Sequence, residues 1–83
     1  MNAKETNDLK VFEMMASGNE YFEINVDENY MTIFIKKTNA DMQINLKKVK
    51  KVNSMSPYTI SIISESYAYV FISLLTGNIS VSI

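Results

Sequence analysis

The side chains that could carry chemistry in this chain of 83 residues are carboxylates, lysines and tyrosines, because it contains no cysteine and no histidine. Thiol nucleophiles, imidazole bases, disulfides and His/Cys metal sites are therefore excluded. Acid–base catalysis by carboxylates needs a second titratable group nearby with a separated pKa. Glu65 stands alone in a Ser-Glu-Ser turn, and no spacing singles out a lysine or tyrosine. We predict a non-enzymatic protein with no cofactor and no metal site.

Six of the eight lysines fall within residues 36–51, where Asp41 is the only acidic residue. Such a basic segment could follow a phosphate backbone. The same lysines could instead guard an exposed strand edge against aggregation. The complete absence of arginine, the preferred residue for phosphates and base edges, weakens the nucleic-acid hypothesis. Nucleic-acid binding stays the alternative function, and its residues would be Lys36, Lys37, Lys47, Lys48, Lys50 and Lys51.

Acidic residues gather at the other end of the chain, where the first 35 positions hold seven carboxylates against two lysines. Glu20, Glu23 and Asp27 occupy alternate or near-alternate positions of an expected strand. They could imitate phosphates toward a partner that binds nucleic acid, or simply form the solvated face of a hairpin. We interpret the acidic and basic segments together as an electrostatic surface that steers a protein partner.

Three aromatic residues, Tyr67, Tyr69 and Phe71, alternate along a stretch that is apolar on both faces. Aromatic residues in this arrangement can stack on single-stranded bases. They are also enriched in the buried centres of protein interfaces. The neighbouring expected strands supply serine and threonine rather than lysine, which favours the protein interface. We therefore predict that these three residues contact a partner or a second copy of the chain, making a homodimer.

The elements that must position these residues begin with a helix, which Thr6 or Asn7 would cap and Gly18 would end. After Glu20 the apolar period changes from about 3.6 to 2, which indicates strands. Ser54, Ser56 and the only proline predict a bend or loop within residues 47–57. The last strand should be Ile79, Val81 and Ile83 facing inward and alternating with serines. These patterns predict about five to six short strands joined mostly by hairpins.

One domain spanning residues 1–83 is expected, since two separate cores would each be too small to fold alone. The fold class is α+β: a short N-terminal helix followed by an antiparallel meander in a curled or half-barrel sheet. A single helix covers only part of such a sheet, so the sheet curls, forms a sandwich, or packs on a second copy.

The sequence also bears on location and role. It shows neither a signal peptide nor an apolar run of about 20 residues, so we expect a cytoplasmic protein without a membrane segment. Abundant lysine, isoleucine and asparagine without arginine is typical of AT-rich genomes, which include those of low-GC bacteria and their phages. The predicted function is a small protein–protein interaction module, such as a phage or bacterial accessory inhibitor that binds a host protein, self-associating through its C-terminal strands.

Overall fold

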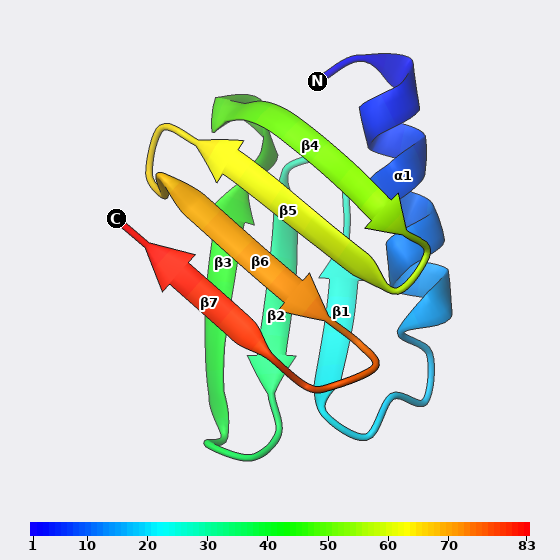
Figure 1. The fold of residues 1–83 in the computed structure, drawn as a ribbon. Coiled ribbons are helices and arrows are strands. Elements are labelled where there is room, and N and C mark those ends of the chain that lie inside the picture. The colour runs from blue at the N-terminus through cyan, green and yellow to red at the C-terminus, as the bar shows by residue number, and fades with distance from the viewer.

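The computed structural model describes residues 1–83 as one helix followed by seven strands in two antiparallel sheets (Figure 1). This confirms the α+β class and the hairpin-connected meander. A single 3₁₀ turn, Leu46–Lys48, links the two sheets. The elements are α1 (Ala3–Met15), then sheet A with β1 (Phe22–Val26), β2 (Tyr30–Ile35) and β3 (Ala40–Asn45), then sheet B with β4 (Val49–Ser56), β5 (Thr59–Ser64), β6 (Tyr69–Ser73) and β7 (Ile79–Ser82).

Strand β4 occupies the segment for which the sequence predicts a bend, so that prediction is wrong. The pairing of β4 with β5 is irregular in two places, between Val49 and Lys51 and between Ser54 and Ser56. Each irregularity interrupts the alternation of inward and outward side chains. Val49 and Val52 are both buried although three positions apart, which hides the period of 2. The proline lies in the β4–β5 turn rather than in a longer loop.

Helix α1 begins about one turn earlier than the sequence suggests, because Asn2 caps it rather than Thr6 or Asn7. The side chain of Asn2 accepts a hydrogen bond from the Glu5 backbone N–H at 2.8 Å. The Glu5 carboxylate in turn accepts one from the Asn2 backbone N–H at 3.0 Å. This reciprocal pair is a capping box, which satisfies two N–H groups that the helix itself leaves free. Gly18 has the expected left-handed backbone, with φ of 72°.

The core lies between the two sheets, with the strands of sheet B crossing those of sheet A (Figure 1). Helix α1 runs along one side, next to β1 and β4, and contributes Leu9 and Phe12 to the core, to which its C-cap adds Ala16. Most of the expected inward-facing strand residues are buried. Two C-terminal ones are not, since Val81 is 46% exposed and Ile83 is 96% exposed. No helix of the structure has the length and apolarity that a membrane crossing requires.

Candidate functional site

On the side of the molecule covered by α1, helix side chains form hydrogen bonds with backbone groups of two edge strands. Strand β4 is an edge of sheet B, and its Val52 N–H donates to Glu5 Oε2 at 2.8 Å. Strand β1 is an edge of sheet A, and its Val26 N–H donates to Glu13 Oε2 at 2.6 Å. Lys10 Nζ donates to the Val26 carbonyl oxygen at 2.6 Å. These three contacts occupy backbone groups on both edges, and α1 lies alongside the two strands.

Glu5 takes part in both the helix cap and the edge of β4. Hydrogen bonds from the Asn2 and Val52 backbone N–H groups, in that order of size, lower the pKa of its carboxyl group. Both bonds favour the charged form, because an ionised carboxylate is the better acceptor. The charge of Glu5 is therefore coupled to the folded arrangement of α1 against sheet B.

The opposite side of the sandwich exposes the edges of β3 and β7 (Figure 1). The Ser73 N–H donates to the Asn78 carbonyl oxygen at 2.9 Å. Together with the pairing of β6 and β7, this bond shows which residues of β7 form hydrogen bonds with β6. Because antiparallel hydrogen bonds alternate, Ser80 and Ser82 direct their backbone groups toward β6. The N–H and C=O groups of Ile79, Val81 and Ile83 consequently point outward. No charged side chain or proline occurs from Ser66 to Ile83 to block this edge.

The aromatic residues singled out in the sequence lie near this edge but do not all share one face. Tyr69 and Phe71 are on the outer face of β6, opposite Ser82 and Ser80 of β7. Tyr69 is 41% exposed, and Phe71 is half-buried. Tyr67 comes before the strand and packs against the core instead. On the same outer face, Met55 of β4 and Ile63 of β5 are also exposed, so the patch extends across sheet B.

The lysines do not form one surface. Lys36 and Lys37 lie in the β2–β3 hairpin, at one end of sheet A. The other four, Lys47, Lys48, Lys50 and Lys51, follow β3 and lie beyond its opposite end. The six residues of β3 separate the two groups by about 20 Å at the usual rise of a strand. A single phosphate-binding stripe through all six lysines is thus not present.

The acidic residues are also divided. Glu20 and Glu23 are exposed near the start of β1, whereas Asp27 lies beyond the end of that strand. Asp27 has a local structural role, since its Oδ1 accepts hydrogen bonds from the backbone N–H groups of Tyr30 at 2.8 Å and Asn29 at 2.7 Å. These two bonds lower the pKa of Asp27. Its carboxylate thus shapes the β1–β2 turn.

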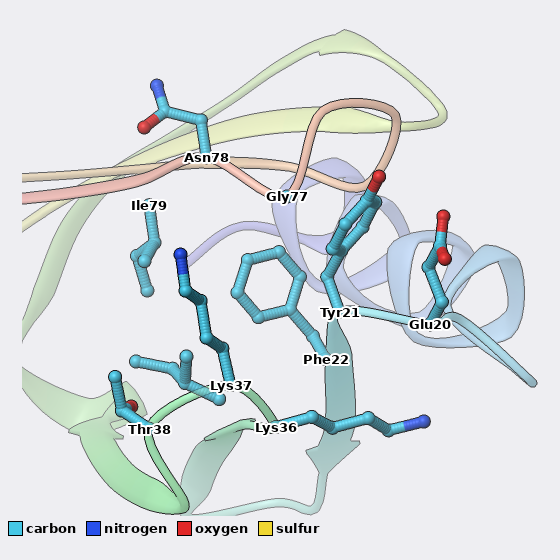
Figure 2. Close-up of a pocket in the computed structure, with 10 residues that line it drawn as sticks. Glu20, Tyr21, Phe22, Lys36, Lys37, Thr38, Gly77, Asn78 and Ile79 are labelled. Atoms are coloured by element: carbon cyan, nitrogen blue, oxygen red, sulfur yellow. The ribbon is translucent and has the colours of Figure 1, made fainter.

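A pocket of about 610 Å³ opens at the end of the molecule where the β2–β3 hairpin and the β6–β7 turn approach the start of β1 (Figure 2). Phe22, Ile35 and Ile79 give it an apolar lining. Its rim carries polar side chains, among them Lys37 and Asn78. Three segments distant in sequence therefore supply one concave surface.

Tyr21 forms one wall of the pocket by packing directly on Gly77. A Cβ atom placed on Gly77 would lie 2.5 Å from Tyr21 Cδ1 and 2.6 Å from Tyr21 Cγ, so only glycine permits this approach. Gly77 also has a left-handed backbone, with φ of 74°. The neighbouring Glu20 carboxylate, first as a hydrogen-bond acceptor for the Tyr21 hydroxyl and then through its negative charge, raises the pKa of Tyr21.

Asn19 forms hydrogen bonds with several of the segments around the pocket. Its Oδ1 accepts hydrogen bonds from the backbone N–H groups of Tyr21 at 2.9 Å and Phe22 at 3.1 Å. Its Nδ2 donates to the Leu74 carbonyl oxygen at 3.0 Å, which reaches sheet B. Its own carbonyl oxygen accepts from Lys36 Nζ at 2.6 Å. One side chain and its backbone thus connect the end of the helix, β1, the β2–β3 hairpin and the segment after β6.

The residues that build this pocket were not singled out by the sequence reasoning, apart from Lys36, Lys37 and Glu20. Asn19 belongs to a Ser-Gly-Asn sequence that is typical of a helix end, and Gly77 to a Gly-Asn pair that is typical of a hairpin turn. The Asn at the helix stop and the Gly-Asn turn were visible signals. Their contacts, however, join positions 55 and 56 residues apart, as Asn19 to Leu74 and Tyr21 to Gly77. Local patterns carry no information about such pairs.

The fold and these surfaces define a small two-sheet α+β protein with one covered and one uncovered side. Comparison with protein-family models, curated proteins and solved structures finds no match to this chain. Function is therefore inferred from the surfaces themselves.

Proposed function

We propose that the protein is a non-enzymatic interaction module that self-associates through its C-terminal strands. The β7 strand of one copy pairs with the β7 strand of a second copy. The outer face of sheet B, with Tyr69 and Phe71, contacts a protein partner. The observation that carries this proposal is the contrast between the two sides of the sandwich. Helix side chains bond to backbone groups at the edges of β1 and β4, and α1 lies beside both strands, whereas the edge of β7 is left free.

The β7 edge has features that favour pairing with an extended strand. Native proteins usually protect free edges with lysines, prolines, bulges or a covering element. Strand β7 has regular register with β6 and none of the first three, although it is only four residues long. Val81 faces the core side of the sheet and is still 46% exposed, so an added strand would cover it. This is the arrangement used in recognition by strand addition.

A second copy fits this edge because the sequence of β7 is self-complementary in antiparallel register. With Val81 on the two-fold axis, Ile79 of one copy lies opposite Ile83 of the other. The outward N–H and C=O groups of these residues then form about six backbone hydrogen bonds. Apolar side chains pair on one face and serines on the other. No charged side chain from either β7 meets a like charge.

Pairing of this kind joins the two copies of sheet B into one continuous sheet of eight strands. The exposed residues Met55, Ile63 and Tyr69 then occur twice on one outer face, in two apolar patches separated by Ser80 and Ser82 of the paired β7 strands. Larger exposed apolar patches mark interaction surfaces. The exposed carboxylates Glu20 and Glu23 lie elsewhere, around the start of β1, and supply charge that steers a protein partner.

The test is the solution mass of the chain and of Val81→Pro over a dilution series. The Val81 N–H points away from β6, so proline removes a donor to the second copy without removing a β6–β7 hydrogen bond. A four-residue strand buries less than a standard interface, so we expect a weak, concentration-dependent dimer. Val81→Pro should be monomeric at every concentration, and Val81→Ala, which keeps the N–H, should still dimerise.

Three results would count against the proposal. A wild-type chain that is monomeric at the highest concentration removes the self-association. A Val81→Pro dimer as tight as wild type removes β7 as the interface, and if Tyr69→Lys is then monomeric, the outer face is the contact between copies. A mass that rises with a mixed oligonucleotide pool, with a log–log salt slope of about −3 to −4, would favour the nucleic-acid alternative through the lysines.

A further inference from the structure

We propose that the pocket between the start of β1, the β2–β3 hairpin and the β6–β7 turn binds a small organic carboxylate with an apolar body. This site is separate from the β7 edge and the outer face of sheet B, and the inference does not depend on self-association. Its volume of about 610 Å³ is within the range of about 300–1,000 Å³ typical of small-molecule sites. Its lining of apolar side chains with a few polar groups at the rim is also typical of them.

The charge at the rim favours an anion. Lys37 extends across the mouth of the pocket toward Asn78, while Lys36 points away from it (Figure 2). Lys36 Nζ already donates to the Asn19 carbonyl oxygen, whereas Lys37 takes part in neither of the two ion pairs of the protein. The one carboxylate among the residues that line the pocket, Glu20, lies on the other side of the Tyr21 ring (Figure 2). A negative group beside Lys37 therefore meets an unpaired ammonium and no close negative charge.

The residues around Lys37 favour a carboxylate attached to an apolar group. Phe22, Ile35 and Ile79 are core residues or pack against the core, and they line the pocket beside the Lys37 side chain. The Asn78 amide and the Thr38 hydroxyl, both exposed at the rim, supply further donors for carboxylate oxygens. A single ammonium with two neutral donors suits a singly charged anion. Phosphate sites usually combine several charges or a nest of backbone N–H groups.

The pocket is built rigidly enough to bind without rearrangement. The Tyr21 ring is held against Gly77, which leaves no space for the ring to move toward the turn. Asn19 fixes the backbone of Tyr21 and Phe22 and ties it to Leu74, which directly follows β6. A site whose walls are already in place loses less conformational entropy when a ligand binds.

The test is titration of the ¹⁵N-labelled full chain with 4-phenylbutyrate, followed by amide chemical shifts, with 4-phenylbutylamine as a probe of the same apolar body and opposite charge. We expect saturable shifts from 4-phenylbutyrate at Phe22, Thr38 and Gly77. The amine should bind more weakly at the same amides. Lys37→Gln should weaken 4-phenylbutyrate binding about fivefold, the size of one exposed charge contact. The matched control Lys47→Gln, at the far end of β3, should leave it unchanged.

The proposal is overturned by any of the following results. The first is that 4-phenylbutyrate produces no saturable shift at the pocket amides. The second is that its shifts gather instead on the outer face, at Ile63 and Tyr69. The third is that the acid and the amine bind equally well, or that Lys37→Gln and Lys47→Gln have equal effects. None of these results depends on whether the chain is a monomer or a dimer.

Discussion

Replacing Gly77 with alanine should destabilise the protein much more than the same replacement at Gly18, although both glycines have left-handed backbones, with φ of 74° and 72°. An L-residue in this conformation costs about 1–2 kcal/mol, and this cost applies equally at the two positions. A Cβ on Gly18 meets no heavy atom within 4 Å. A Cβ on Gly77 would lie 2.5 Å from Tyr21 Cδ1. Gly18→Ala therefore measures the backbone cost alone.

The additional cost at Gly77 comes from the Tyr21 ring. The new methyl group would also contact Tyr21 Cγ at 2.6 Å, and this atom is close to the backbone, so a small rotation of the side chain does not relieve the overlap. Overpacking of this kind costs about 1–3 kcal/mol. We expect Gly77→Ala to lower the free energy of unfolding by about 2–5 kcal/mol, the sum of the two contributions.

The assay is urea unfolding followed by far-ultraviolet circular dichroism at one fixed protein concentration, so that any dimer contributes equally. The same substitutions are then made in a Tyr21→Ala background, where Gly77→Ala should cost only what Gly18→Ala costs. The difference between backgrounds is the coupling free energy of residues 21 and 77. Equal effects of Gly77→Ala and Gly18→Ala with Tyr21 in place would refute the close packing of this wall.

Other expected outcomes concern the groups that fasten the fold. Asn19→Ala leaves the Tyr21 and Phe22 N–H groups and the Leu74 carbonyl without their partner, so the free energy of unfolding in urea should fall by about 1–3 kcal/mol; no loss would mean that water replaces the side chain fully. Glu5 has a lowered pKa in the folded state, so its contribution to stability is complete above its ordinary pKa of 4.5 and is lost as the pH falls through the lower, folded value. Glu5→Gln should therefore flatten the decline in unfolding free energy measured below about pH 5, and an unchanged pH profile would contradict this linkage.

The sequence predicts the strands of sheet A and the C-terminal hairpin well, because apolar residues recur at every second position in these strands and a Gly-Asn pair marks the last turn. Strand β4 escapes detection because two irregularities in its pairing with β5 break the alternation at Val49 and Ser54. The start of α1 is missed because the cap depends on Asn2 and Glu5, which precede the first apolar residue of the helical pattern. Both errors arise where local geometry departs from a simple period.

Little of the candidate site follows from the sequence. Tyr69 is exposed, as a residue that contacts a partner must be. Tyr67, which the sequence groups with it, lies before the strand and packs against the core. The lysine-rich region divides because β3 runs between its two parts, which a list of charges along the chain does not reveal. The pocket depends on contacts such as Tyr21 with Gly77, and these form only when sheet B crosses sheet A.

The position of Glu5 has a consequence for how this molecule opens. One oxygen of its carboxylate closes the first turn of α1 and the other holds the Val52 amide of β4, so fraying of the helix and exposure of that strand edge belong to a single cooperative event. The amides of Glu5 and Val52 should then exchange hydrogen with solvent at similar free energies of opening. The N-terminal helix thereby protects the edge of β4, a strand that is synthesised almost fifty residues after Glu5.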